Sequence, residues 1–450
     1  MGREVFVYKA GTEQVKRFEV MPDFRFDQWT NLYASRVSNM RSSEIREMMA
    51  VTGRPDIISF AGGLPDTRCF PVNQIVEATQ RVMLREGAAA LQYGASEGYE
   101  ALRRHIVDIM AEINVELGVD DLIITDGAQQ ALEFLGKIFI SKGDSIIVEG
   151  PSYVGALQAF SGFEPNVIAI PLDDSGMRVD ILADRLKELA VRGIQPKFLY
   201  TVPNFHNPAG FTLSAERRKE IIELSMKYGF IIIEDDPYGR LRYDGVEQPS
   251  LKSMYENVIY LGTFSKIFAP GMRLGWVAAP KAILEKLVKA KEAANLCSGS
   301  FAQRVTEEYM SVFDWRRNVE VFIDLYRERR DAMLAALEEY FPDGSTWSRP
   351  SGGLFIWATL PEGLNSGEML AEAIREAKVA YVPGRAFYYG EGGESSMRLN
   401  FSYCPPETIY EGIKRLGAVI KQQLALYRSL LKGYSTDNKP AGIKAQDKKE

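Results

Sequence analysis

Residues 230–238 have the sequence FIIIEDDPY, in which a short apolar run is followed directly by two acids and a tyrosine. Similar runs, separated by longer amphipathic stretches, are LIIT (122–125), SIIVE (145–149), NVIAI (166–170), KFLYTV (197–202), NVIYL (257–261) and GWVAA (275–279). Short, continuously apolar runs are typical of strands that are covered on both faces. The pattern therefore predicts an α/β fold with a mostly parallel, doubly wound sheet in a large domain.

The pattern changes after this sheet. Residues 303–340 are predicted to form one long amphipathic helix. The segments that follow are FIWATL (355–360), a helix-like stretch over 366–378, VAYV (379–382) and MRLNFS (397–402). This mixture predicts a smaller α+β domain, against which SSEIREMMAVT (42–52) could also pack. The expected regions are an N-terminal extension (1–25), the first part of the small domain (26–75), the large domain (76–315), the second part of the small domain (316–433) and a disordered tail (434–450).

The composition excludes several classes of protein. With 54 Lys and Arg against 60 Asp and Glu, the net charge is −6, so the chain lacks the basic field of a general nucleic-acid or membrane-surface binder. The start of the chain has no apolar signal-peptide core, and the longest uncharged run, 198–215, contains prolines that a membrane-spanning helix would not tolerate. Three scattered cysteines and only two histidines predict neither disulfides nor a metal site, and they favour the cytoplasm.

Ligands of doubly wound sheets bind beyond the carboxyl ends of the strands, so the residues at those ends are the first candidates for a site. LIIT (122–125) is followed by Asp126-Gly127-Ala128-Gln129, which begins a predicted helix. The N-terminus of this helix suits a phosphate, although Asp-Gly is also an ordinary turn. Asp235-Asp236 follows another run. One of these carboxylates could pair with a cationic ring nitrogen, although adjacent acids are also common on solvated loops.

A lysine in an apolar segment is the third candidate. GTFSKIFAPGMR (262–273) places Lys266 just after the hydroxyl-bearing Thr263 and Ser265 and seven positions before Arg273. A desolvated lysine has the lowered pKa that Schiff-base chemistry needs. The Thr-x-x-Lys spacing is similar to the Ser-x-x-Lys of β-lactamases, but their SDN and KTG motifs do not occur. The nucleotide fingerprints GxGxxG and GxxxxGK[ST] and the GxSxG elbow do not occur either.

Taken together, these segments resemble the class I and II aminotransferases of fold type I, which use pyridoxal phosphate (PLP). The motifs are Asn207-Pro208-Ala-Gly210, Asp235-x-x-Tyr238, Thr-x-Ser-Lys266 with Arg273, and Arg398. SFAGGLPD (59–66) and LQYGASEGYEALR (91–103) resemble the branch that contains 2-aminoadipate, kynurenine and aromatic amino acid aminotransferases. The resemblance covers about residues 30–432.

The resemblance implies a role for each residue around the cofactor ring. Lys266 would bind the cofactor aldehyde as a Schiff base and later carry the proton between the substrate α-carbon and the cofactor. Asp235 would pair with the ring nitrogen, which leaves Asp236 a structural role. Tyr238 and Asn207 would bond the ring oxygen. A cis peptide near Pro203 or Pro208 would help to aim Asn207.

The implied phosphate site combines a helix N-terminus with hydroxyls and a guanidinium. Its residues are Ala128, Gln129, Thr263, Ser265 and Arg273. Relatives often have Ser at the position of Ala128, so the resemblance implies one hydroxyl bond fewer to the phosphate here, while the backbone N–H remains. Tyr153 would stack on the cofactor ring, with a core tyrosine as the alternative.

The remaining implied residues concern the substrate and a second subunit. Arg398 would hold the substrate α-carboxylate through a bidentate pair; an exposed strand arginine is the alternative. Arg46, Gly62 and Gly63 would line the side-chain pocket, although Arg46 also suits an exposed helix face. Tyr93 would reach the cofactor phosphate of a neighbouring subunit, which makes a homodimer with a shared active site the expected assembly.

The expected function is transfer of the amino group of an aromatic, kynurenine or 2-aminoadipate type amino acid to a 2-oxo acid. 2-Oxoglutarate is the expected acceptor, and ping-pong kinetics should follow. One alternative is a PLP-dependent lyase that performs β-elimination on the same scaffold. Another is a non-catalytic regulator, which would need a DNA-binding module longer than the roughly 30 residues ahead of the resemblance. The preferred amino acid stays open.

Overall fold

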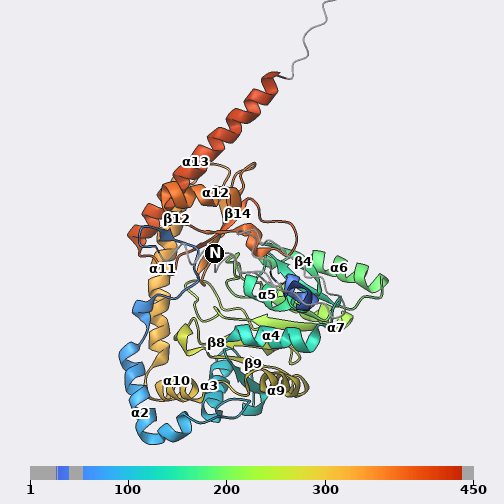
Figure 1. Ribbon diagram of the computed structural model, residues 1–450, viewed down its shortest axis with the longest axis vertical. Coiled ribbons are helices and arrows are strands. Elements are labelled where there is room, and N and C mark those ends of the chain that lie inside the picture. Colours follow the sequence, from blue (N-terminus) through green and yellow to red (C-terminus); the bar gives the residue numbers. More distant parts are fainter. Residues whose placement is uncertain (1–26, 28, 40–53, 438–450) are drawn as a thin grey trace, which may run out of the picture.

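The computed structural model describes residues 27, 29–39 and 54–437, with the side chains of 432–437 left out (Figure 1). The expected N-terminal extension, the segment 42–52 with Arg46, and residues 438–450 of the expected tail lie outside this part of the chain. The last helix, α13 (Pro406–Asp437), continues through residues 434–437, so these four residues are helical where a disordered tail was expected.

The central sheet has eight strands within the described residues, in the order β2-β9-β8-β7-β6-β3-β4-β5. Their bounds are β2 Leu122–Thr125, β3 Ser145–Gly150, β4 Asn166–Asp173, β5 Gly176–Met177, β6 Phe198–Thr201, β7 Ile231–Asp235, β8 Ile259–Thr263 and β9 Gly275–Ala278. The five strands from β8 to β4 in this order are parallel, whereas β9 and β5 pair antiparallel with their neighbours. The predicted mostly parallel sheet is confirmed.

Helices cover the sheet on both faces (Figure 1). The helices of the large sheet are α3 Glu100–Ala111, α4 Ala128–Phe139, α5 Val154–Ser161, α6 Val179–Val191, α7 Ala215–Tyr228, α8 Leu251–Met254 and α9 Lys281–Asn295. Along β3, Ile146 and Val148 belong to the core beneath α4 and α5, while Ile147 belongs to the core beneath α6 and α7. This alternation explains why the strand is apolar at every position.

A smaller antiparallel sheet carries the C-terminal part of the chain. Its four strands have the order β10-β11-β14-β13, with bounds β10 Thr346–Trp347, β11 Phe355–Thr359, β13 Val382–Pro383 and β14 Ser396–Asn400. A separate pair joins β1 (Ile58–Ser59) in parallel to β12 (Val379–Ala380). The chain before the large sheet therefore packs against the chain after it.

The predicted single helix over 303–340 is wrong, because the chain breaks near residue 313. Here α10 (Ser300–Val312) ends, Phe313 is extended, and α11 (Trp315–Tyr340) begins. The Asp314 carboxylate accepts a hydrogen bond from the Arg317 N–H (3.2 Å) and caps the new helix. An N-cap aspartate satisfies a free helix N–H and so favours a fresh start over continuation.

The remaining helices are α2 (Val72–Ala90), which packs on α10, and α12 (Ser366–Glu372), which continues as a π-helix over Ala373–Ala377. In the described part of the chain, no helix has the length and apolar character needed to cross a membrane.

Candidate active site

A cavity of about 350 Å³ lies at the carboxyl ends of the parallel strands. Asp235 ends β7, Thr263 ends β8, and Asn207 follows β6, so the three residues reach the same edge of the sheet. Most of the predicted residues line this one cavity: Gly63, Ala128, Gln129, Tyr153, Asn207, Asp235, Tyr238, Thr263, Ser265, Lys266, Arg273 and Arg398.

Lys266 lies in the loop after β8, and its amine donates a hydrogen bond to the carbonyl of Gly63 (2.8 Å). Burial lowers the pKa of this amine to about 8, helped by the positive charges of Arg398 and Arg273. The neutral amine is therefore accessible near neutral pH, as a nucleophile or base requires.

Asp235 is buried at the floor of the cavity. Its Oδ2 accepts a hydrogen bond from the Tyr200 phenol (2.7 Å), while its buried Oδ1 has no partner among the described residues. Burial raises the pKa of this carboxyl to about 7, opposed by the bond from Tyr200 and reinforced by the charge of Asp236. A buried carboxylate oxygen without a donor fits the cationic ring nitrogen of PLP, which would supply that donor.

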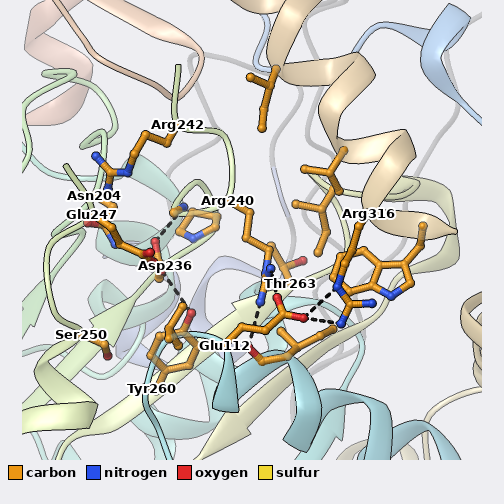
Figure 2. Close-up of a pocket in the computed structure, with 18 of the residues that line it drawn as sticks. Glu112, Asn204, Asp236, Arg240, Arg242, Glu247, Ser250, Tyr260, Thr263 and Arg316 are labelled. Carbon is orange, nitrogen blue, oxygen red and sulfur yellow. Dashed lines mark hydrogen bonds and ion pairs between the residues drawn. The ribbon is translucent and has the colours of Figure 1, made fainter. Parts of the chain in front are cut away.

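The neighbouring carboxylate points elsewhere. Asp236 accepts hydrogen bonds from the Gly239 N–H (2.9 Å) and the Tyr260 phenol (3.1 Å). It lines a second cavity of about 370 Å³, where Figure 2 shows it pointing toward Tyr260. Successive side chains at the end of a strand face opposite sides, which is why only one of the two acids reaches the first cavity.

Asn207 connects the two walls of the cavity. Its Nδ2 donates to the Tyr238 hydroxyl (3.3 Å), and its Oδ1 accepts from Nη1 of Arg398 (3.0 Å). Burial raises the pKa of Tyr238, so the phenol stays protonated. The Asn207–Pro208 peptide is cis, as hypothesised, and Gly150–Pro151 is a second cis peptide that was not anticipated.

Arg398 projects from the middle of β14 into the cavity, and it is only 2% exposed. This burial excludes the alternative of an exposed strand arginine. Nη2 donates to the carbonyl of Ala61 (2.7 Å), and the guanidinium lies 4.2 Å from the ring centre of Phe355 and 5.0 Å from that of Phe387. Burial lowers its pKa to about 10, which leaves it charged at neutral pH.

The helix α4 presents its N-terminus to the cavity. Gly127 precedes it with φ of 80°, and a Cβ here would lie 2.6 Å from the Arg273 guanidinium. Arg273 is held over this turn by a bond from Nη2 to the carbonyl of Asp126 (3.0 Å). A guanidinium beside the positive end of a helix dipole suits a phosphate dianion.

Two hydroxyls stand beside this turn. The Thr263 hydroxyl donates to Oγ of Ser265 (3.0 Å), and both residues line the cavity. Tyr153, at the N-cap of α5, donates to Oε1 of Gln129 (3.3 Å), and burial raises its pKa. The hydroxyls of Thr263 and Ser265 fit a phosphate, and the ring of Tyr153 fits an aromatic ring stacked on it.

Three of the predicted residues are not among the described residues that line the cavity. Gly62 precedes Gly63 but is not among the lining residues. Tyr93 lies outside and is 77% exposed. Arg46 falls outside the described residues.

Several residues of the site were not predicted from the sequence. Tyr200, which holds Asp235, was available as the one hydroxyl-bearing aromatic in the apolar run 197–202. The other missed residues line the cavity and gave no signal of their own: Leu64, Val154, Gly155, Gln158, Val202, Pro237, Pro270 and Phe355.

Comparison with known proteins gives the family. The family model of aminotransferase class I and II matches residues 55–416. The aromatic-amino-acid aminotransferase 1 of Thermococcus litoralis is 46% identical over 395 residues, which are 87% of this chain and 94% of that protein.

Two solved structures agree. The Pyrococcus horikoshii kynurenine aminotransferase, in complex with PMP, is 44% identical with a TM-score of 0.85, covering 88% of this chain and 99% of that one. The α-aminoadipate aminotransferase of Thermus thermophilus, complexed with N-(5'-phosphopyridoxyl)-L-leucine, is 35% identical with a TM-score of 0.82 and the same coverage. The chain belongs to the class I and II aminotransferases, PLP-dependent transaminases of fold type I, in the branch of the aromatic, 2-aminoadipate and kynurenine enzymes.

Proposed function

We propose that this aminotransferase moves the amino group of an aromatic, kynurenine or 2-aminoadipate type amino acid to 2-oxoglutarate, in a ping-pong reaction. The names of its relatives support the substrate class. The observation that carries the proposal is that an amine, a carboxylate and a guanidinium, from Lys266, Asp235 and Arg398, line one cavity.

PLP, when bound, supplies an electron sink for the charge left when the substrate α-proton departs. Asp235 would hold its ring nitrogen through the unpartnered Oδ1, and Asn207 and Tyr238 would hold its ring oxygen. The N-terminus of α4, Thr263, Ser265 and Arg273 would hold its phosphate.

Lys266 would carry the proton. With a pKa of about 8, its amine can both accept a proton from the substrate α-carbon and return one, since the two protonation states lie close in free energy near neutral pH. The bond to the Gly63 carbonyl limits where the amine can point.

Arg398 would bind the substrate α-carboxylate. Its two nitrogens, Nη1 and Nη2, now donate to uncharged oxygens, and its buried Nε has no partner among the described residues. A carboxylate is a stronger acceptor than an amide or peptide oxygen, so a substrate would displace these weaker contacts. The rings of Phe355 and Phe387 limit the tilt of the guanidinium.

The proposed assembly is a homodimer in the cytoplasm. An exposed Tyr93 that lies outside its own cavity is free to reach the cofactor phosphate of a second subunit. The three cysteines are free thiols, which fits a reducing compartment.

Product analysis tests the reaction. The cofactor-loaded enzyme is incubated with kynurenine, 2-aminoadipate, phenylalanine or a cysteine S-conjugate, first alone and then with 2-oxoglutarate. A transaminase produces one equivalent of 2-oxo acid per site alone and turns over only with the acceptor. Thiol, pyruvate and ammonia released from the cysteine S-conjugate without an acceptor would instead identify the lyase, and no product from any of these amino acids would refute both enzymatic alternatives.

A further inference from the structure

The loop between β6 and α7 carries Asn207 into the cavity, and one buried histidine sits at its centre. The backbone N–H of His206 donates to the carbonyl of Phe211 (2.8 Å), and the Gly210 N–H donates to the carbonyl of His206 (2.6 Å). His206 is 2% exposed and is not among the residues that line the cavity. The proposed reaction gives it no role.

The ring of His206 has one defined tautomer. Its Nδ1 accepts a hydrogen bond from the Ala209 N–H (3.2 Å), so the ring proton must be on Nε2. Nε2 lies 3.0 Å from Oε2 of Glu149, without the alignment of a hydrogen bond. The ring thus lies between the loop and the end of β3.

Glu149 is equally buried, at 2% exposure, and collects donors from another strand. Its Oε1 accepts from the Thr201 hydroxyl (2.8 Å), and its Oε2 accepts from the Val202 N–H (2.9 Å). These two donors, with the ring of His206 beside Oε2, surround the carboxylate. The carboxylate accepts both bonds at once, whereas an amide would keep the bond from the Val202 N–H only with its oxygen at the position of Oε2 and would then donate to the Thr201 hydroxyl.

The residues fixed in this way flank Asn207 on both sides. His206 precedes it and Ala209 follows two positions later, and both are tied to one ring. The amide of Asn207 in turn bonds Tyr238 and Arg398, whose proposed partners are the cofactor and the substrate carboxylate. A shift of the loop would therefore move the Asn207 amide and so disturb the proposed sites of both the cofactor and the substrate carboxylate.

We propose that His206 and Glu149 are a positioning pair that aims the Asn207 amide at the cofactor and at Arg398. This inference rests on the proposed function. Neither residue touches the reacting atoms; each acts by keeping Asn207 in place. Removing the ring leaves the Ala209 N–H without its acceptor and leaves a space beside the Glu149 carboxylate, so the loop would relax and the Asn207 amide would move.

A double-mutant cycle with cofactor binding as the first readout tests this pair. Apo-protein of His206→Ala, Asn207→Ala and the double variant is titrated with PLP, and kcat/KM is then measured with a good amino acid substrate. We expect His206→Ala to weaken PLP binding and lower kcat/KM about tenfold each, the scale of one lost buried polar contact. In the Asn207→Ala background the same change should have less than about a twofold effect.

Two further variants separate aiming from packing. His206→Asn keeps an acceptor near Nδ1 and should recover most of the PLP affinity, whereas His206→Gln, which reaches only toward Glu149, should recover less. Glu149→Ala, which removes the group beside Nε2, should behave like His206→Ala, whereas Glu149→Gln, which keeps an oxygen there, should lie nearer wild type. The other histidine, His105, bonds Ser311 away from the cavity (2.9 Å), and His105→Ala should match wild type.

The crystal structure of His206→Ala supplies a readout that is independent of activity. The distance from Asn207 Oδ1 to Arg398 Nη1, 3.0 Å in the wild type, should lengthen beyond hydrogen-bonding range. Additive losses in the cycle, or an unmoved amide, would overturn the positioning role. A wild-type protein that fails to bind PLP would overturn the proposed function instead, so the two failures are distinguishable.

Discussion

Replacing Asp235 by asparagine should stabilise the apo-protein while weakening its hold on the cofactor. The carboxyl is buried, and its pKa rises from the ordinary 3.8 to about 7, chiefly through burial. Between these two pH values the unfolded chain loses this proton and the folded chain keeps it, so the free energy of unfolding falls as the pH rises. Above about pH 7 the loss is complete, and the difference in pKa corresponds to about 4 kcal/mol.

An asparagine side chain is uncharged, so its burial does not carry the free-energy cost of burying an ionised carboxylate. It keeps an acceptor for the Tyr200 phenol, although an amide oxygen is a weaker acceptor than a carboxylate, which costs about 1 kcal/mol. The apo-form of Asp235→Asn should therefore exceed wild type in unfolding free energy by about 3 kcal/mol at pH 8. Near pH 4 this advantage should disappear.

Urea unfolding of both apo-proteins across pH 4 to 8 measures this difference, with the exposed Asp343→Asn as a surface control. The cofactor should show the reverse trend: loss of one charge-assisted bond of about 1.5–3 kcal/mol weakens PLP binding by about 10- to 150-fold. A stability difference that is constant with pH would refute the raised pKa of Asp235, and a variant that binds PLP as tightly as wild type would refute the pairing of Asp235 with the ring nitrogen.

Three further predictions concern other parts of the site. Lys266→Ala should lower kcat by at least about 10³-fold, since a general acid–base is lost, whereas the exposed Lys142→Ala should not; near-normal turnover would remove Lys266 from catalysis. Arg398→Lys should raise KM for every amino acid about tenfold or more, because an ammonium cannot form the bidentate pair, with Arg349→Lys on the surface as the control and an unchanged KM as the contrary result. Tyr93→Phe should weaken PLP binding but not dimer formation in sedimentation, and a fully active wild-type monomer would contradict the shared site.

The sheet could be predicted because its signal is local. A strand buried on both faces must be apolar at every position, so an apolar run such as residues 231–233 can be recognised as a strand from the sequence. The break between α10 and α11 was missed because apolar spacing continues across it and only the cap at Asp314 marks the new start. Periodicity reports which face is buried, whereas a cap depends on one hydrogen bond.

The site depended more on resemblance than on pattern. Nothing in the acidic pair at the end of β7 says which carboxylate faces the ligand, whereas the structure separates Asp235 from Asp236 through their different partners. Tyr200 was missed since its partner lies 35 residues away in sequence, and only the neighbouring position of β6 and β7 brings the two together. The spacing of residues along the sequence does not show which strands are neighbours in the sheet.

The electrostatics of the cavity explain how it can be specific for charged ligands. Lys266 bonds a carbonyl, Arg398 bonds an amide and a carbonyl, and Asp235 bonds a phenol, so in the described part of the chain none of the three is neutralised by an opposite charge within 4 Å. Burial moves the pKa of each toward its neutral form, to about 8, 10 and 7. Folding has thus desolvated these groups without pairing them, and a ligand that brings a phosphate, a ring cation and a carboxylate recovers that free energy on binding. An uncharged analogue of the same shape recovers none of it, so the charge pattern selects the ligand more strongly than cavity volume does.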